Sequence, residues 1–328
     1  MIRLLNTNSS PTDIIIVTGP TASGKTELLS QLFAKEAPDF FQSFSGTIAR
    51  PYDHVEIISA DSMQAYRGMD IGTAKPDSAL ILALPHHLID IKNPDEQYTA
   101  GEFVKLADSL IEEMRGRVLP IISGGTGFYL KNFIMGPPTA PPSDPKIRNQ
   151  VQEDLQRFGI SVLREELLRA DPASYARIAY NDIYRLTRAL EIIRMSAKPL
   201  SAFAPSALPR PGYRFLVLGV ERSRQELRER IAQRVEAMFA AGLPAEVERL
   251  KQHGYTADSP GMQAIGYREF FELEGSSVDV IKAAITLHTQ QYAKRQMTFF
   301  KSLPGIQWIQ PIVSQLAEKI REFLLHRS

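Results

Sequence analysis

Hydrophobic positions along the chain fall into two alternating patterns. Four short apolar runs, rich in β-branched residues, each end in turn residues, which is typical of strands buried on both faces of a parallel sheet. These runs are 13–18, 55–60, 118–123 and 214–220. Between them, segments such as 26–35 and 101–115 repeat apolar residues every three or four positions, as amphipathic helices do. The alternation predicts an α/β fold with a parallel sheet and helices on both faces, like that of P-loop NTPases.

Proline-rich stretches divide this pattern. Residues 136–145 contain five prolines, which cannot continue the interior of a strand or a helix, and we expect a stiff linker there. A second proline-rich stretch covers 199–211, and 147–195 between them has helical periodicity without strand candidates. The pattern predicts a core domain of 1–136 and 212–328 with an all-helical insertion at 137–211.

Composition narrows the class of protein. The 328 residues are 44% hydrophobic and 23% charged, as in an ordinary globular protein. The net charge of +1 means that a nucleic-acid partner needs a local basic surface, and the lack of cysteine excludes disulfides, thiolate metal sites and a cysteine nucleophile. The chain starts without a leader-like segment and has no apolar run approaching ~18 residues, so we expect a cytoplasmic protein without membrane contact.

A glycine-rich loop follows the first predicted strand and precedes a helix. It consists of Gly19, Pro20, Thr21, Ala22, Ser23, Gly24, Lys25 and Thr26. Such a loop turns successive backbone N–H groups toward a phosphate at a helix N-terminus. Lys25 adds a positive charge, and Thr26 offers a hydroxyl to Mg²⁺. The loop therefore indicates a polyphosphate ligand with Mg²⁺, without specifying ATP.

The second predicted strand ends in Asp61, where the ligand crevice of such a sheet is expected. The carboxylate could hold Mg²⁺ through water, accept a proton from a nucleophile, or cap the next helix. The third strand runs into a turn with Gly124, Gly125, Thr126 and Gly127. Thr126 could donate a hydrogen bond to a ligand oxygen, although many sheets end this way for packing alone.

A long helix is predicted over 278–302, with one stripe that ends in Tyr292, Arg295 and Phe299. This stripe places Arg295 on the inward face, where an unpaired guanidinium is costly, so it requires an anionic partner. That partner is either a protein carboxylate or a bound diphosphate. His288 lies on the same stripe and is left without a role.

Seven segments together resemble the tRNA dimethylallyltransferase family, also called tRNA isopentenyltransferase, over nearly the whole chain. They are GPTASGKT (19–26), ISADSMQAYRGMDIGTAKP (58–76), HHLID (86–90), SGGTGFY (123–129), NDIYRLTRALE (181–191), AIGYRE (264–269) and YAKRQMTFF (292–300). The resemblance implies that N6 of the adenine beside the anticodon, at position 37, attacks C1 of dimethylallyl diphosphate and releases diphosphate.

The resemblance also implies roles for single residues. Asp61 is the expected general base, Thr126 and Arg295 are the expected contacts of the bridging oxygen, and Lys25 and the loop amides hold the phosphates, with Mg²⁺ at Thr26. Family positions that contact the anticodon stem-loop of tRNA are matched by Asp61, Ser62, Met63, Gln64, Arg148, Arg185, Leu186, Thr187, Arg188, Ala189, Gly266, Tyr267, Arg268, Lys294, Arg295, Gln296 and Lys301. From the residues alone, the arginines at 185 and 188 are equally compatible with a solvated helix face. We expect a monomer.

Departures from the family pattern are few. Gln290 and Gln291 stand where the family usually has Arg or Lys, and Phe128, Phe299 and Lys301 replace Leu, Trp and Arg. These changes bear on tRNA affinity rather than on the reaction. Three other readings stay open: an isopentenyltransferase acting on free adenine nucleotides, a P-loop kinase acting on a small molecule, and a non-catalytic RNA-binding protein.

Overall fold

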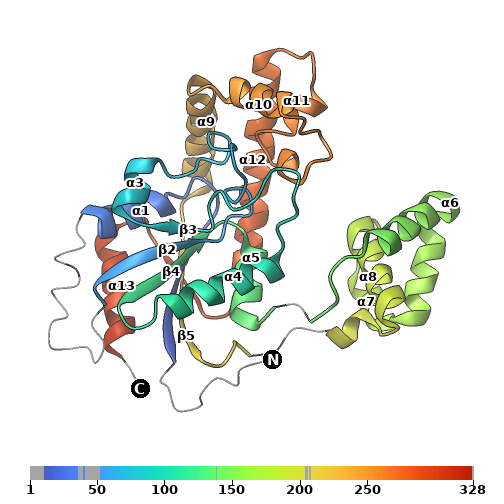
Figure 1. Cartoon of the computed structure of the whole chain (residues 1–328), viewed down its shortest axis with the longest axis horizontal. Helices are drawn as coiled ribbons and strands as arrows, with labels where there is room; N and C mark the ends of the chain where they lie inside the picture. Colours follow the sequence, from blue (N-terminus) through green and yellow to red (C-terminus); the bar gives the residue numbers. More distant parts are fainter. Residues whose placement is uncertain are drawn as a thin grey trace. The chain divides into compact units, whose positions relative to one another are not determined.

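The computed structural model describes residues 11–35, 40, 52–137, 139–203, 206 and 208–326. Its centre is one parallel sheet of six strands in the order β3-β2-β4-β1-β5-β6 (Figure 1). The strands are β1 (Thr12–Thr18), β2 (His54–Ser59), β3 (His86–His87), β4 (Val118–Gly124), β5 (Tyr213–Val220) and β6 (Ile306–Ile309). The four strands predicted from apolar runs are confirmed as β1, β2, β4 and β5. The pattern missed the edge strands β3 and β6, because two and four residues are too few to show a buried run.

Helices cover both faces of the sheet, as predicted. On one face, Ile15 and Val17 of β1 belong to the same buried cluster as Leu29 and Ile320 from two covering helices. On the other face, the ring of Phe133 lies against Phe215 of β5, with ring centroids 6.1 Å apart. Inner strands such as β1 and β5 are therefore covered on both faces, which explains why their sequences are continuous apolar runs.

Eleven helical elements of the described residues lie outside the segment 136–209 and accompany the sheet. They are α1 (Lys25–Ser30), the π-helical turn η1 (Gln31–Lys35), α3 (Ser78–Ala83), α4 (Ala100–Glu113), α5 (Gly127–Met135), α9 (Arg224–Ala240), α10 (Leu243–Gln252), the 3₁₀ turn η3 (Pro260–Gln263), α11 (Glu269–Glu272), α12 (Val278–Phe300) and α13 (Val313–Leu325). Local capping sets several of their starts. Thr99 Oγ1 accepts from the Glu102 N–H at 3.2 Å, and Ser223 and Glu226 form a reciprocal capping box.

The chain divides into two compact units. The core unit comprises Met1–Ile134 and Arg210–Ser328, and the helical unit comprises Met135–Pro209. The helical unit contains α6 (Pro145–Ala170), α7 (Pro172–Arg177), α8 (Ile183–Ser196) and the 3₁₀ turn η2 (Leu200–Phe203). Residues of α6 and α8, among them Leu163, Leu167 and Leu190, form its own buried cluster.

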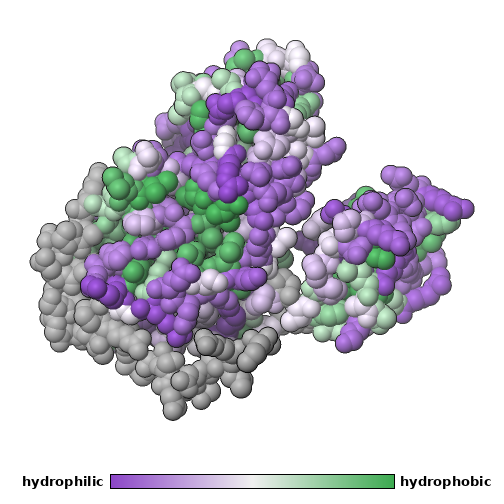
Figure 2. Space-filling view, in the orientation of Figure 1, coloured by the Kyte–Doolittle hydropathy of each residue, from purple (hydrophilic) through white to green (hydrophobic). Residues whose placement is uncertain are grey.

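Pro145 was expected to belong to the linker, and that expectation is wrong. Proline is tolerated in the first turn of a helix, and Pro145 begins α6 behind Asp144, whose side chain accepts from the N–H groups of Lys146 and Ile147. Both units present many hydrophilic residues on the face drawn in Figure 2, with hydrophobic patches on the core unit. No helix of the described residues is long and apolar enough to cross a membrane.

Candidate functional site

Three strand ends bring the predicted motifs together. Strands β2, β4 and β1 are neighbours, and they end level because Ser59 pairs with Ser123 and Thr18 with Gly124. The glycine-rich loop follows β1, Asp61 follows β2, and Thr126 follows β4. The carboxyl edge of the sheet therefore places these motifs side by side, as the sequence predicted.

The turns after β2 and β4 are in direct contact. The Ala60 N–H donates to the Ser123 carbonyl at 2.8 Å, and the Thr126 N–H donates to the Ala60 carbonyl at 3.0 Å. A Cβ atom on Gly124 would lie 2.2 Å from the Ala60 carbonyl oxygen, so only glycine fits there. The close approach fixes the distance between Asp61 and Thr126.

The glycine-rich loop folds around its lysine. Gly19 has a φ of 149°, and a Cβ atom there would lie 2.6 Å from the Val220 carbonyl oxygen. Lys25 Nζ donates to the carbonyls of Gly19 at 2.8 Å and Pro20 at 3.1 Å. Burial lowers the pKa of Lys25 to about 8, Asp61 opposes the shift, and Arg234 adds to it. The ammonium is therefore poorly compensated, and a bound anion would stabilise its charged form.

Three side chains from distant parts of the chain bind the backbone of the loop or of the neighbouring turn. The Gln296 amide bridges the site, because it accepts from the Thr21 N–H at 2.8 Å and donates to the Gly125 carbonyl at 2.7 Å. Arg222 donates to the Ser23 carbonyl at 2.9 Å, and Arg230 donates to the Ala22 carbonyl at 2.8 Å. The two arginines occupy loop carbonyls and Gln296 occupies the Thr21 N–H, and together these bonds help to fix the conformation of the loop.

Asp61 uses one carboxylate oxygen locally. Its Oδ1 accepts from the Met63 N–H at 2.9 Å and the Gln64 N–H at 3.4 Å, so it caps a turn rather than a helix. Thr126 Oγ1 accepts from the Ser62 N–H at 2.9 Å and donates to Ser62 Oγ at 3.2 Å. No described residue donates a hydrogen bond to Asp61 Oδ2, which leaves this oxygen for a ligand.

Two cavities meet at Asp61. The loop cavity, of about 620 Å³, surrounds the glycine-rich loop and Thr26. The helix cavity, of about 360 Å³, lies between α9 and α12. Both are lined by Thr21, Asp61, Thr73, Arg234 and Tyr292. Burial and the Asp61 carboxylate raise the pKa of the Tyr292 phenol, so this hydroxyl stays protonated as a hydrogen-bond donor.

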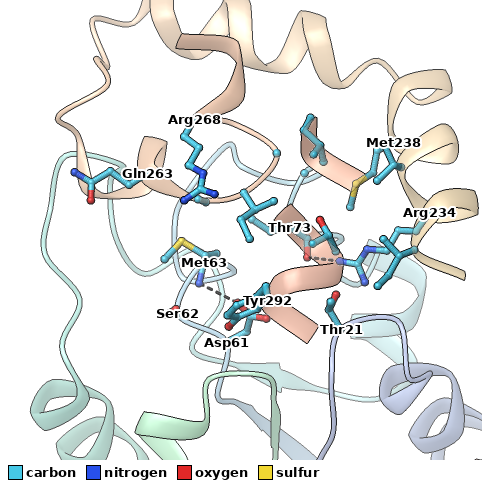
Figure 3. A pocket seen from close by; sticks show the side chains of 18 of the residues that line it. Thr21, Asp61, Ser62, Met63, Thr73, Arg234, Met238, Gln263, Arg268 and Tyr292 are labelled. Atoms are coloured by element: carbon cyan, nitrogen blue, oxygen red, sulfur yellow. Dashed lines mark hydrogen bonds between the residues drawn. The ribbon is translucent and has the colours of Figure 1, made fainter. Parts of the chain in front are cut away.

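The helix cavity has chemically distinct walls (Figure 3). Its apolar wall consists of Ile231, Val235, Met238, Ile265 and Ile285. Its polar groups include Arg234 from α9 and Arg268 from the start of α11, which approach from different sides in Figure 3. A small apolar group and a polar planar group would both find partners in this space.

The predicted inward position of Arg295 is wrong. Arg295 is exposed, and its guanidinium lies 5.8 Å from the ring centroid of Tyr292. The buried residues of α12 are instead Ile281, Ile285, Ala293, Gln296 and Phe300. The inward face of α12 therefore includes Gln296 rather than Arg295, and the two positions differ by about 100° around the helix axis. Arg295 lines the helix cavity but not the loop cavity, and forms no ion pair with a described carboxylate.

Arg234 is the arginine that lines both cavities, and no sequence motif marked it. One of its Nη atoms lies 3.4 Å from the Thr73 carbonyl. Burial lowers the pKa of Arg234, and Asp61 opposes that shift. The spacing gave only a partial signal, because Arg234 stands beside Val235 and three residues after Ile231, which are both buried, and this pattern does not show which cavities the side chain reaches.

Among the core-unit residues expected to contact tRNA, Ser62, Met63, Gly266 and Arg268 line the helix cavity. Lys294 and Lys301 are exposed on α12. Two expectations do not fit the structure. Tyr267 is 0% exposed and donates to Glu246 at 2.7 Å, and Gln296 is 5% exposed with both ends of its amide engaged.

The turn after β2 holds the last of these core-unit positions. The Gln64 amide accepts from Ser59 Oγ at 3.1 Å and donates to the Ala74 carbonyl at 3.2 Å, so it ties this turn to the next loop. The side chain still lines the loop cavity.

In the helical unit the positions expected to contact tRNA differ in exposure. Arg148 and Arg185 are exposed. Arg188 is half-buried, donates to the Pro141 carbonyl and pairs with Glu191 at 2.8 Å. The side chains of the other three positions are buried and face the core of the unit. They are Leu186, Thr187 and Ala189.

The oxygen atoms at the glycine-rich loop are suited to bind Mg²⁺ only together with the phosphate oxygens of a ligand. The described residues contain no group of three His, Cys, Asp or Glu side chains that could hold a metal. Thr26 is exposed and lines the loop cavity with Asp61. Mg²⁺ is commonly held by one or two protein oxygens together with phosphate oxygens and waters, and these residues fit that arrangement.

Comparison with known proteins gives a consistent result. The family profile described as "IPP transferase" matches residues 64–303. The chain is 40% identical over 309 residues to a tRNA dimethylallyltransferase of Geobacter sulfurreducens, covering 93% of this chain and 94% of that protein. A crystal structure of tRNA delta(2)-isopentenylpyrophosphate transferase from Staphylococcus epidermidis matches with a TM-score of 0.63 and 34% identity, covering 97% and 100% of the two chains. A eukaryotic dimethylallyltransferase crystallised while acting on tRNA matches with a TM-score of 0.74 and 25% identity, covering 95% of this chain and 77% of that one.

Proposed function

The chain belongs to the IPP transferase family and is a tRNA prenyltransferase, and on that premise we propose how its site works. Dimethylallyl diphosphate is the donor, N6 of the adenine at position 37, beside the tRNA anticodon, is the acceptor, and diphosphate is released. One observation carries this assignment. The cavity around the cationic loop and the cavity with the apolar wall share Asp61, so a leaving group and an acceptor can meet at one carboxylate.

The donor diphosphate occupies the loop cavity. The loop N–H groups and Lys25 bind its phosphates, and Lys25 exchanges its two carbonyl contacts for ligand oxygens. Mg²⁺ held at Thr26 would neutralise charge on the diphosphate. The dimethylallyl group then extends toward the apolar wall of the helix cavity, where Val235 and Ile285 exclude water.

Transfer takes place beside Asp61. The N6 nitrogen forms a bond to C1 of the donor while its proton moves to Asp61 Oδ2, the oxygen without a described donor. The C1–O bond breaks, and its electron pair leaves with the diphosphate. Arg234, which lines both cavities, stabilises the charge that develops on the departing oxygen. Thr126, expected in the same role, lines neither cavity, and its hydroxyl donates to Ser62 Oγ at 3.2 Å. Arg234 replaces Arg295 in this role, because Arg295 does not line the loop cavity.

The acceptor adenine must leave the anticodon loop to enter the helix cavity, as bases do for chemistry of this kind. Arg268 and the Tyr292 hydroxyl offer hydrogen bonds to its edge. The exposed Arg148 and Arg185 of the helical unit bind phosphates of the anticodon stem. We place the enzyme in the cytoplasm as a monomer.

The test is mass spectrometry of nucleosides from tRNA incubated with the protein and dimethylallyl diphosphate. The expected product is an adenosine heavier by one dimethylallyl group, formed with release of diphosphate. Parallel reactions offer AMP with the same donor, and ATP in place of the donor. Faster transfer to AMP than to tRNA would assign the free-nucleotide reaction instead, and phosphoryl transfer from ATP would assign a kinase.

A further inference from the structure

A third cavity lies on another flank of the helix pair that forms the acceptor site. It has a volume of about 420 Å³ and lies between the first turns of α9 and the second half of α12. Ile231 lines both this cavity and the helix cavity. We propose that this third cavity, the flank cavity, binds the sugar-phosphate backbone of the tRNA that receives the dimethylallyl group.

Charge is the first reason for this proposal. Arg224 and Arg228 stand one turn apart on α9, and Lys294 and Lys301 stand two turns apart on α12. None of these four cations forms an ion pair with a carboxylate of the described residues. Arg222 also lines the cavity, but it already contacts the Ser23 carbonyl and Glu226. Four unpaired cations in two facing rows suit a chain of phosphates better than a single small anion.

The floor of the cavity is the second reason. Apolar side chains line the cavity together with the cations, among them Leu227, Leu287 and Met297. The amides of Gln290 and Gln291 stand beside them and supply both donors and acceptors. Cations for phosphates, apolar surface for a sugar or a base, and amides for its edge make up the chemistry that recognises a single RNA strand.

The position of the cavity decides which step it serves. This inference rests on the proposed function, because it deepens the recognition of the same tRNA. The flank cavity shares no lining residue with the loop cavity, so it contributes to tRNA affinity and not to donor binding or bond breaking. A chain with a net charge of only +1 needs such a local cluster to hold RNA.

The test uses the double variant Arg224→Gln/Arg228→Gln in the full-length protein. Binding of unmodified tRNA without donor is measured over a range of salt concentrations. We expect the Kd to rise about tenfold and the slope of log K against log salt to become shallower by about 1.5, because two phosphate contacts are lost. The donor KM and the kcat at saturating tRNA should match those of the parent. The matched control is Arg249→Gln/Arg321→Gln, which removes two exposed arginines elsewhere in the core unit and should leave the Kd and the slope unchanged.

Adding Gln291→Lys to the double variant returns a cation to the same cavity and should recover part of the affinity and of the salt slope. An unchanged Kd and slope in the double variant would overturn the proposal. A raised donor KM with normal tRNA binding would also overturn it, since the cavity would then serve the donor. Because binding is measured without transfer, a wild-type protein that bound tRNA in this way but formed no prenylated adenosine would refute the proposed function and leave this site intact.

Discussion

Replacing Arg234 by Gln tests the central feature of the site. Arg234 is the arginine that lines both the loop cavity and the helix cavity, with Asp61 between them. Its side chain is half-buried, burial lowers its pKa, and its only described hydrogen bond is a long one, 3.4 Å, to the Thr73 carbonyl. The variant keeps a polar side chain of similar length and removes the charge.

The expected loss follows from that placement. A unit charge about 4 Å from a developing oxyanion is worth about 4 kcal/mol at an effective dielectric constant of about 20. Removal of one preorganised oxyanion donor commonly costs about 10²- to 10³-fold in kcat, which corresponds to about 2.7–4 kcal/mol. We therefore expect kcat to fall by two to three orders of magnitude. Because Arg234 also lowers the pKa of Lys25, the variant should raise that pKa.

The assay is single-turnover transfer from labelled dimethylallyl diphosphate to tRNA at saturating concentrations of both, with donor affinity measured across pH 6.5 to about 9.5. Arg295→Gln is the matched control, because Arg295 is exposed and lines only the helix cavity. This control should raise the KM for tRNA and change kcat by less than about threefold. If Arg295→Gln lowered kcat more than Arg234→Gln, the assignment of the two arginines would be reversed and the reasoning refuted.

Three more predictions address neighbouring groups. Asp61→Asn should lower kcat by at least about a hundredfold with a small change in the Kd for tRNA, because the proton acceptor is lost; equal loss of both, measured by transfer and filter binding, would argue for a binding role only. Donor affinity should be highest below pH 8 and fall as pH rises through 8, because unliganded Lys25, whose pKa is about 8, then loses its proton. Calorimetry should show no such fall in Lys25→Arg. If the variant and the parent had the same pH profile, the assignment of Lys25 would be contradicted. Tyr267→Phe should lower the free energy of unfolding by about 1.5–3 kcal/mol in urea, because buried Glu246 loses a donor at 2.7 Å; the exposed Tyr184→Phe is its control and should stay within about 0.5 kcal/mol.

The sequence could predict the sheet interior and the motifs at its edge. Strands β1, β2, β4 and β5 are buried on both faces, so each is a continuous apolar run that can be recognised without its neighbours. Parallel strands bring their carboxyl ends to one edge, so the loop after β1, Asp61 and Thr126 had to meet there. The edge strands β3 and β6 are too short to carry such a pattern.

The sequence could not predict which residue of one helix turn faces inward. On α12, Arg295 and Gln296 differ by one residue, about 100° of rotation, and a stripe drawn through the apolar residues can pass through either one. The packing partners decide between them: Gln296 finds the Thr21 N–H and the Gly125 carbonyl, whereas Arg295 finds solvent and the Tyr292 ring.

Local sequence thus determined the four inner strands, the phosphate-binding loop and the carboxylate beside it, because each depends on residues that are close in the chain. The tertiary structure decided which cation reaches both cavities. Arg234 lies far along the chain from Lys25 and Asp61, and the connection from β5 to α9 brings it to the cavities that they line. Long-range packing alone sets that arrangement, since no local pattern of α9 encodes the strand ends that it will face.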